Sequence, residues 1–319
     1  MKRALLVGID YYENFSPLYG CANDAAAIHP LLRRNEDGGP NLDCRLASAR
    51  DVATQVSRDR LKEMIRELLS GGAEFALLYF AGHGAQTDGG VALATSDGTE
   101  GTPGVQFSDI LAAINKSSVD EVTVILDCCF SGGATTIEAL DNGLANLRNG
   151  LAVLTASRDD QVSMETADGR GQFSTYLEGA LKAGAADVLG RINVAGLYSY
   201  LSESFGAWEQ RPTFKANIDR LHDIRTCKPL VPLETLRKLT EWFPTPGFDY
   251  PLDPTYEPTN NKERNPNEKI FAGLQKYRAC RLVEPIKEEH MFFAAMNSTG
   301  CRLTPLGKHY WSLVKAERI

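Results

Sequence analysis

Two predicted strands of this chain each end in a side chain that can take part in covalent chemistry. His83 stands between two glycines at the end of an apolar run, in the stretch LLYFAGHGAQ, and Cys128 and Cys129 follow the β-branched run VTVILD. Glycines on either side allow a sharp turn and leave the imidazole uncrowded. The carboxyl ends of neighbouring parallel strands meet at one edge of a sheet, so we expect imidazole and thiol to emerge there together.

A thiol beside an imidazole is suited to nucleophilic catalysis. The imidazole accepts the thiol proton and stabilises the thiolate, which is the reactive form. The backbone N–H of Gly84 and that of the nucleophile could then point at one carbonyl oxygen and form an oxyanion hole. These residues predict His83 as the base and leave open which of Cys128 and Cys129 attacks.

The elements that must position these side chains alternate between strands and helices. Apolar patterns predict strands at 3–10, 74–84 and 151–157, a strand with a Gly-rich turn at 121–133, and helices at 23–34, 58–70, 107–115 and 172–184. Such alternation implies crossover connections and an α/β fold with a mainly parallel sheet sandwiched by helices. Asn23 or Asp24 is expected to cap the first helix.

The remaining residues form a second predicted module. A boundary is expected near residue 221, which gives domains 1–221 and 222–319. The segment 244–267 contains six prolines and few aliphatic residues, which is typical of an extended or irregular connector. Beyond it we predict a small, mostly helical module of three helices, at 267–283, 287–297 and 303–319, with Thr304 and Pro305 as a strong helix start. Its pattern is similar to winged-helix modules.

Charge is unevenly divided between the two predicted modules. The chain has a net charge of −7, but residues 222–319 hold 15 Lys and Arg against 12 Asp and Glu, a net of +3. Proteins that bind DNA usually present a denser basic face. We therefore expect residues 222–319 to recruit or restrain the first module, and we expect an activating or recruiting protein to bind them. We do not expect nucleic acid as a partner.

The remaining composition favours a reduced, cytoplasmic protein. The seven cysteines are odd in number and scattered along the chain, unlike a disulfide framework. Asp10 interrupts the first apolar run before a signal-peptide core is complete, and no apolar run is long enough to cross a membrane. No histidine and cysteine spacing matches a metal site, and no phosphate loop is present, so neither a metal nor another cofactor is expected.

Several motifs in order resemble one known family. The start LLVGIDYYENFSPLYGCANDA, the stretch YFAGHGAQ and the stretch LDCCFSGG are similar to the first strand, histidine motif and cysteine motif of the caspase-like cysteine peptidases, within their metacaspase and prokaryotic branch. His83 and Cys129 are 46 positions apart, close to the separation of about 50 residues in caspases. LTASRDDQVSME and EQRPTF match later landmarks, so the resemblance covers about 220 residues.

The resemblance implies a role for individual positions. His83 corresponds to the catalytic histidine and Cys129 to the nucleophile, so Gly84 and Cys129 would supply the oxyanion hole, while Cys128 would be a pocket-wall residue. Asp24 and Asp127 correspond to carboxylates that line the primary specificity pocket, which would favour a guanidinium or ammonium group. The alternative for Asp24 is a helix cap alone. Asp159 and Asp160 fall in a loop that corresponds to a pocket wall.

The function implied is a cysteine endopeptidase that cleaves a partner protein after Arg or Lys. Its setting would resemble bacterial antiviral defence or regulated cell death, in which such peptidases mature a toxic partner. Some metacaspases need calcium; their acidic ligand cluster has no clear counterpart here, and calcium dependence stays open. The alternatives are a catalytically silent caspase-like scaffold and a DNA-binding regulator that acts through residues 222–319.

Overall fold

The chain divides into two compact units. In the computed structural model, residues 1–131, 147–156, 169–205, 212–260 and 263–319 are described, without the side chains of 129–131. Unit 1 consists of Met1–Ala186 and Arg191–Cys227, and unit 2 of Asp187–Gly190 and Lys228–Ile319. Each unit has its own hydrophobic core.

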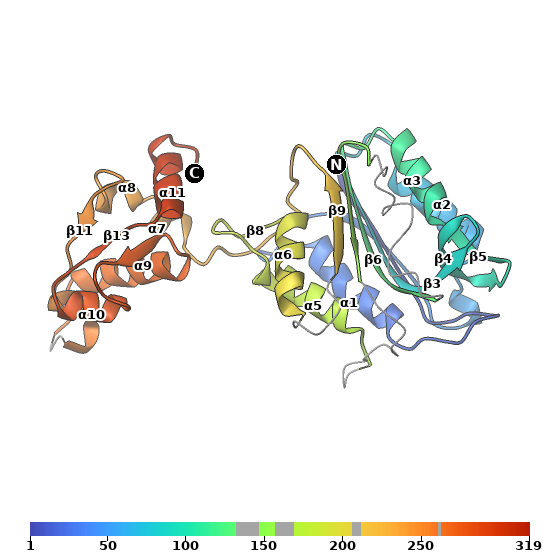
Figure 1. Cartoon of the computed structure of the whole chain (residues 1–319), viewed down its shortest axis with the longest axis horizontal. Helices are drawn as coiled ribbons and strands as arrows, with labels where there is room; N and C mark the ends of the chain where they lie inside the picture. Colours follow the sequence, from blue (N-terminus) through green and yellow to red (C-terminus); the bar gives the residue numbers. More distant parts are fainter. Residues whose placement is uncertain (132–146, 157–168, 206–211, 261–262) are drawn as a thin grey trace. The chain divides into compact units, whose positions relative to one another are not determined.

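Unit 1 is built on a mixed sheet that is mainly parallel (Figure 1). The strands run in the order β2-β1-β3-β6-β7-β9, and β4 and β5 extend from β3 as antiparallel partners. All neighbours from β2 to β7 are parallel, whereas β9 is antiparallel to β7. The strands of this sheet are β1 (Lys2–Ile9), β2 (Asp43–Ala49), β3 (Phe75–Thr87), β4 (Gly90–Thr99), β5 (Thr102–Gln106), β6 (Glu121–Ser131), β7 (Leu151–Thr155) and β9 (Thr213–Asn217).

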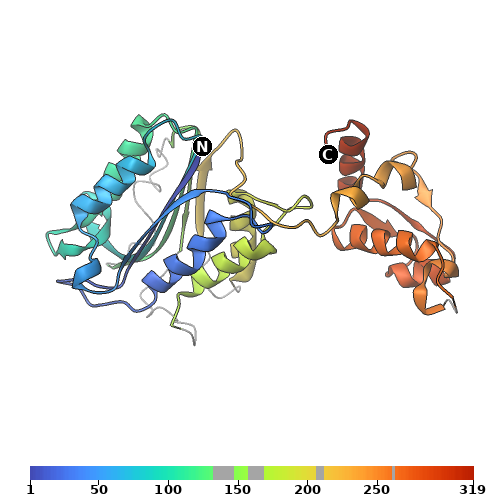
Figure 2. The same ribbon diagram turned by 180° about the vertical axis from the view of Figure 1, so that it is seen from behind.

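Helices cover both faces of this sheet, as Figures 1 and 2 show from opposite sides. On one face lie α2 (Arg58–Leu68) and α3 (Phe107–Lys116), and on the other α1 (Cys21–Arg33), α5 (Gln172–Gly179), the π-helical segment η2 (Ala180–Gly184) and α6 (Val194–Ser204). A short 3-10 turn, η1 (Val52–Thr54), precedes α2. The predicted α/β class is confirmed.

The sequence patterns did not predict every element of unit 1. The predicted strands and helices are all present, but β2, β4, β5, β8 (Arg191–Ile192), β9, β10 (Arg225–Thr226) and α6 were not predicted. β2 lies at the edge of the sheet and is mostly half-buried or exposed, so it lacks the continuous apolar run of a central parallel strand.

The helix α1 packs unusually close to β1, because Gly8 has no side chain. A Cβ atom at Gly8 would lie 2.3 Å from the backbone oxygen of Cys21, the first residue of α1. Neither Asn23 nor Asp24 caps this helix: the Asp10 carboxylate, at the end of β1, accepts hydrogen bonds from the N–H groups of Cys21 (2.8 Å) and Ala22 (3.3 Å). The predicted cap is therefore wrong in position, because a residue distant in sequence satisfies these N–H groups.

Unit 2 combines helices with a small sheet. Its elements are α7 (Leu233–Leu236), α8 (Leu239–Trp242), β11 (Asp249–Tyr250), the 3-10 turns η3 (Pro254–Tyr256) and η4 (Pro258–Asn260), α9 (Asn267–Ala279), β12 (Val283–Pro285), α10 (Met291–Met296), β13 (Cys301–Leu303) and α11 (Pro305–Lys315). The three predicted helices are present as α9, α10 and α11, and Thr304 caps α11. The antiparallel sheet β11-β13-β12 was not predicted. The similarity to winged-helix modules stays a prediction.

The Pro-rich segment 244–267 does not separate the unit into parts. It carries β11 and both 3-10 turns, and its residues Leu252 and Tyr256 are buried in the core of unit 2. Its backbone is irregular, as the prolines predict, but two buried side chains hold it against the core.

The boundary between the units lies after Cys227 and not after residue 221. Residues 222–227 remain with unit 1 because β10 (Arg225–Thr226) pairs with β8 (Arg191–Ile192). His222 also donates its backbone N–H to the buried carboxylate of Glu121 at 3.0 Å, and its Nδ1 lies 2.8 Å from the same oxygen. The two His222–Glu121 contacts join positions about a hundred residues apart, and no local composition change marks them.

Candidate active site

His83 lies where β3 changes its neighbour. The pairing of β1 with β3 ends at Gly8 and Ala81, and the pairing of β4 with β3 begins at Gly84. His83 therefore lies in the gap between the end of β1 and the start of the β4 ladder. We predicted that the strand would end here in a turn; instead β3 continues to Thr87, because β4 and β6 pair with its last residues.

The loop after β1 holds His83 in place. Its backbone N–H donates to the Tyr12 hydroxyl at 2.8 Å, and its Nε2 lies 2.8 Å from the backbone carbonyl oxygen of Ser16. The rings of Tyr12 and Phe15 contact the imidazole, with centroids 4.8 and 6.5 Å away. A carbonyl oxygen can only accept a hydrogen bond, so Nε2 carries the proton and, in the neutral ring, Nδ1 has the free lone pair. This arrangement suits His83 to accept a proton at Nδ1.

The backbone register brings Cys129 to His83. β3 and β6 are parallel, and His83 pairs with Cys129 as Gly82 pairs with Cys128. Both sequence motifs therefore meet at one end of the sheet, as predicted. The side chain of Cys129 lies outside the described residues.

Gly84 follows His83 in β3 and lies in register with Leu93 on one side and Phe130 on the other. Its predicted role as an oxyanion donor, together with Cys129, stays a prediction. Gly82 on the other side of His83 is required for space, since a Cβ atom there would lie 2.7 Å from the Tyr12 hydroxyl.

Cys128 was predicted to be a pocket-wall residue, but it lies in the hydrophobic core. Its side chain is buried in the hydrophobic core that contains Phe80 and the apolar face of α2. Asp127 precedes it on β6, and successive side chains of a strand point to opposite faces. Cys128 is therefore a core residue on the face of the sheet away from Asp127.

Asp24 and Asp127 lie near each other, as predicted, and both are buried. Asp24 comes from the first turn of α1, and Asp127 from β6. Burial, and next the negative charge of Asp127, raise the pKa of Asp24 to about 6. The two carboxylates thus form one acidic cluster at the carboxyl end of the sheet.

A buried hydroxyl pair supports Asp127. The Ser174 hydroxyl, in α5, donates to Asp127 Oδ2, and the hydroxyl oxygens of Tyr79 and Ser174 are 2.6 Å apart. Ser174 has a single hydroxyl proton, which it donates to the carboxylate, so Tyr79 must donate to Ser174. All three side chains are buried, and this chain of hydrogen bonds fixes the orientation of the carboxylate.

Arg170 also belongs to this cluster. Its Nε donates to Asp24 Oδ1 at 2.9 Å, its Nη1 donates to Glu178 of α5, and the N–H of the next residue, Gly171, donates to Asp24 Oδ2 at 3.1 Å. Both oxygens of Asp24 are therefore occupied by residues just before α5. Asp24 thus contacts a guanidinium group of its own chain.

Sequence reasoning missed four residues that hold the predicted site together. Tyr12 and Ser16 lie in the segment quoted for the family resemblance, so their position after the first strand was a usable signal. Ser174 and Arg170 carried no signal, because both reach the carboxylates only through the packing of α5 against α1 and the sheet. Asp159 and Asp160 lie outside the described residues.

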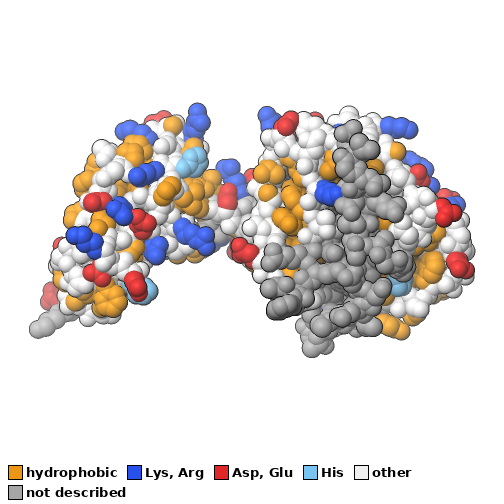
Figure 3. Space-filling view, viewed as in Figure 1, with side chains coloured by type: hydrophobic (Ala, Val, Ile, Leu, Met, Phe, Trp, Pro, Cys, Tyr) orange, Lys and Arg blue, Asp and Glu red, His pale blue; other side chains and the backbone are white. Residues whose placement is uncertain are grey.

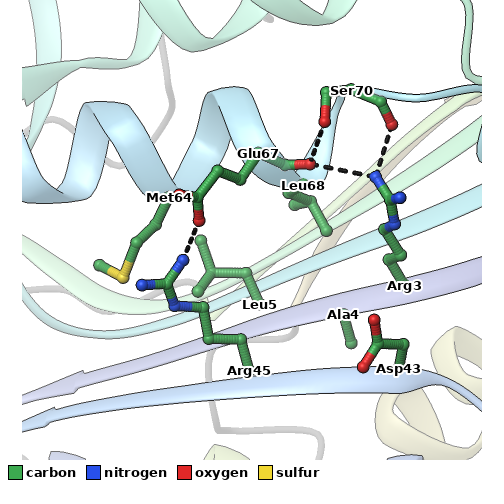
Figure 4. A pocket seen from close by; sticks show the side chains of 9 residues that line it. All are labelled: Arg3, Ala4, Leu5, Asp43, Arg45, Met64, Glu67, Leu68 and Ser70. Carbon is green, nitrogen blue, oxygen red and sulfur yellow. Dashed lines mark hydrogen bonds and ion pairs between the residues drawn. The ribbon is translucent and has the colours of Figure 1, made fainter.

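A cavity of about 330 Å³ lies at the opposite end of the sheet (Figure 4). It is lined by the first residues of β1 and β2 and by one face of α2: Arg3, Ala4, Leu5, Asp43, Arg45, Met64, Glu67, Leu68 and Ser70. Its two guanidinium groups are already bonded, Arg3 to the carbonyl oxygens of Glu67 and Ser70 and Arg45 to the Glu67 carboxylate. None of its lining residues is His83, Asp24 or Asp127, so this cavity is separate from the candidate active site.

No group of three or more His, Cys, Asp and Glu side chains in the described part of the chain is arranged to hold a metal ion. Among the same residues, no helix is long and apolar enough to cross a membrane.

Curated relatives of this chain are metacaspases. It is 26% identical over 227 residues to Metacaspase-1 of Mycosarcoma maydis, in a match that covers 61% of this chain and 53% of that protein. It is 25% identical over 227 residues to Metacaspase-3 of Trypanosoma cruzi, in a match that covers 58% of this chain and 59% of that protein. Metacaspase-7 of Arabidopsis thaliana is 28% identical over 147 residues, with 41% and 35% covered. The chain thus spans about a third to three fifths of the length of these relatives.

A solved structure is similar in fold to this chain, and a family model matches its first 220 residues. The fold is similar to that of caspase-1 from Spodoptera frugiperda, with a TM-score of 0.50 at 12% identity over 71% of this chain and 90% of that chain. The family model described as the caspase domain, a peptidase family, matches residues 1–220. With His83 and Cys129 in register within that region, the chain belongs to the caspase-domain peptidase family.

Proposed function

We propose that this protein is a cysteine endopeptidase that cleaves protein substrates after Arg or Lys, with Cys129 as the nucleophile and His83 as the base. The observation that carries the proposal is the register of β3 and β6, which sets His83 opposite Cys129. The Ser16 carbonyl leaves His83 Nδ1 free to accept the thiol proton. The resulting thiolate would attack the peptide carbonyl, and the N–H groups of Gly84 and Cys129 would stabilise the oxyanion.

The preference for a cationic residue is supported by the acidic cluster. Asp24 and Asp127 are buried and close enough for one charge to act on the other. A guanidinium that enters such a site gains charge-assisted hydrogen bonds away from water, and its planar fork can bond two carboxylates, whereas lysine offers a compact charge. An acidic side chain would meet like charge there, which costs several kcal/mol at interfaces.

The test is a panel of fluorogenic peptides that differ only in the residue before the scissile bond, assayed with and without calcium. We expect arginine peptides to be cleaved fastest, lysine peptides more slowly and aspartate peptides not detectably. Asp127→Asn should reduce the preference for arginine over lysine. Cleavage after aspartate with arginine peptides untouched would contradict the assignment of the pocket, and no cleavage of any peptide would favour a silent scaffold.

We further propose that unit 2 recruits or restrains the peptidase, and that the setting is bacterial defence or regulated cell death through processing of a partner protein. The first part is supported by residues 187–190, which lie between η2 and β8 in the sequence but pack with unit 2, with Val188 and Leu189 against its core. The setting follows from the family resemblance. Mass spectrometry of proteins cleaved in cells that express the wild type or Cys129→Ala would identify the substrate.

A further inference from the structure

The acidic cluster of the proposed specificity pocket already holds a cation. Arg170 bonds Asp24 through Nε at 2.9 Å and Glu178 through Nη1, and its side chain is 19% exposed against 3% for Asp24. In the proposed mechanism, Asp24 is one of the two carboxylates that bind the substrate's guanidinium. A substrate side chain cannot form the same hydrogen bonds while Arg170 occupies them.

We propose that Arg170 is an internal competitor for the substrate: it occupies the cation position beside Asp24 in the free enzyme, and a substrate arginine must displace it. This inference rests on the proposed function, since it assigns a regulatory residue to the same pocket. Arg170 thereby raises the substrate concentration that the enzyme needs, and it excludes side chains that interact with Asp24 less strongly than a guanidinium does.

The charges in the cluster remain balanced when one guanidinium replaces another. Asp24 would exchange the Arg170 guanidinium for that of the substrate. Glu178 would keep a cationic partner, because Lys182 Nζ lies 2.5 Å from its other oxygen, Oε1. Neither Asp24 nor Glu178 is therefore left without a cationic partner by the departure of Arg170, which keeps the cost of the exchange low.

The backbone beside Arg170 is suited to such a movement. Arg170 lies between Gly169 and Gly171, and Gly169 has a φ of +66°; apart from its chain neighbours, no heavy atom of the described residues lies within 4 Å of a Cβ position there. Glycine adopts many backbone conformations without steric cost. The N–H of Gly171 bonds Asp24 Oδ2 independently of the guanidinium, so the start of α5 can stay in place while the Arg170 side chain leaves.

The binding test uses the full-length Cys129→Ala protein, so that no probe is consumed. Calorimetry with Nα-acetyl-L-arginine amide should give a dissociation constant about tenfold lower for Arg170→Gln than for the parent, as expected when a competitor occupies the site in about nine of ten molecules. Arg170→Lys, which keeps a cation, should bind nearly like the parent. Arg60→Gln is a matched control, since Arg60 forms an exposed ion pair with Glu63 on α2, and it should change nothing.

Each outcome of the binding test has one meaning. Tighter binding by Arg170→Gln supports the proposal. Equal or weaker binding overturns it, because Arg170 would then be a permanent structural clamp, while the cation pocket of the proposed function would stand. Absence of binding in every variant, Arg170→Gln included, overturns both, because Asp24 and Asp127 would then not bind a substrate cation even with Arg170 removed.

Kinetics with an arginine peptide provide a second, independent measurement. Arg170→Gln should lower KM about tenfold with kcat unchanged, since the competitor affects only substrate binding. Glu178→Gln loosens Arg170 without altering Asp24, so it should lower KM in the same direction and keeps the proposal testable if Arg170→Gln does not fold. A fall in kcat with unchanged or higher KM in Glu178→Gln would contradict the proposal.

Discussion

At His83, the hydrogen bond to one backbone carbonyl determines which ring nitrogen can accept a proton. The Ser16 oxygen accepts from Nε2 at 2.8 Å, and the Tyr12 hydroxyl accepts from the backbone N–H of His83 at the same distance. Neither partner is a carboxylate, so a backbone carbonyl is the group that orients the proposed base. The ring is held by its surroundings before any substrate binds, which reduces the cost of organising the base during reaction.

The identity of the nucleophile can be tested with the two adjacent cysteines. Cys129→Ala should abolish cleavage of an arginine peptide, whereas Cys128→Ala should keep most of the activity, because Cys128 is buried in the core opposite Asp127. His83→Ala should lower kcat on the order of a hundred- to ten-thousand-fold with little change in binding. If Cys128→Ala were inactive and Cys129→Ala active, the assignment of Cys129 as the nucleophile would be wrong.

The ionisation of Asp24 should appear in the stability of the protein. Burial and Asp127 raise the pKa of Asp24 to about 6, above the value near 3.9 of an unfolded chain. The folded state therefore binds a proton that the unfolded state releases, and the stability contributed by this group falls as the pH rises from about 4 through 6.

The measurement is urea unfolding of the wild type and of Asp24→Asn between pH 4 and 7. A shift of this size corresponds to roughly 3 kcal/mol at most, so we expect the wild type to lose up to that amount relative to Asp24→Asn over this range. A difference between the two proteins that is constant with pH would show that Asp24 titrates normally.

At the scale of elements, a change of strand neighbour creates the site. The pairing of β1 with β3 ends at Ala81 and the pairing of β4 with β3 begins at Gly84, so the loop after β1 can reach His83 from that side of β3. On the other side, β6 runs parallel to β3 through the same residues and carries Asp127 and Cys129. Strand register thus positions both the proposed base and the proposed pocket, and paired strands are rigid compared with a loop.

Gly82 should be essential to this arrangement. A Cβ atom at Gly82 would lie 2.7 Å from the Tyr12 hydroxyl and 3.0 Å from the Phe80 ring, so Gly82→Ala must displace Tyr12 from the His83 N–H. We expect a loss of roughly 1–3 kcal/mol in stability, as for other overpacked sites, and a lower kcat. Gly101→Ala is the control, because in the described part of the chain no heavy atom beyond its chain neighbours lies within 4 Å of its Cβ position. Unchanged activity in Gly82→Ala would rule out a positioning role for Tyr12.

At the scale of the whole molecule, the two units share the chain in an interleaved way. Residues 187–190 belong to unit 2, although η2 before them and β8 after them belong to unit 1. η2 continues directly from α5, which begins just after Arg170. Residues 187–190 of unit 2 are therefore connected through η2 to the helix that carries Ser174 and Glu178.

Unit 2 should not bind DNA. Residues 222–319 carry a net charge of only +3, and cationic and anionic side chains are interspersed on the face of unit 2 visible in Figure 3. Because affinity for DNA depends on many phosphate contacts, full-length Cys129→Ala should not retard a duplex in a mobility-shift assay near 0.15 M salt. Salt-dependent retardation at micromolar protein would instead favour the DNA-binding alternative.

The sequence by itself determined the α/β class, the central strands and the two motifs that carry His83 and Cys129. These properties follow from local patterns: continuous apolar runs mark buried parallel strands, and reactive residues after such runs lie at the same end of a parallel sheet. The nearness of Asp24 and Asp127 was also predictable, but only through the resemblance to a family. Edge strands such as β2 were not predicted, because an edge strand need not be apolar on both faces.

Only the tertiary structure decided what surrounds those residues. Three contacts join positions that are not neighbours in the sequence: Asp10 caps α1, the Ser16 carbonyl bonds His83 and the Arg170 guanidinium bonds Asp24. The core that buries Cys128 likewise contains residues distant in sequence, such as Phe80. The physical reason is that a buried polar group needs a hydrogen-bond partner, and any residue that packing brings within reach can supply it. Residue type and spacing therefore predict which groups could react, whereas packing determines what each of them contacts.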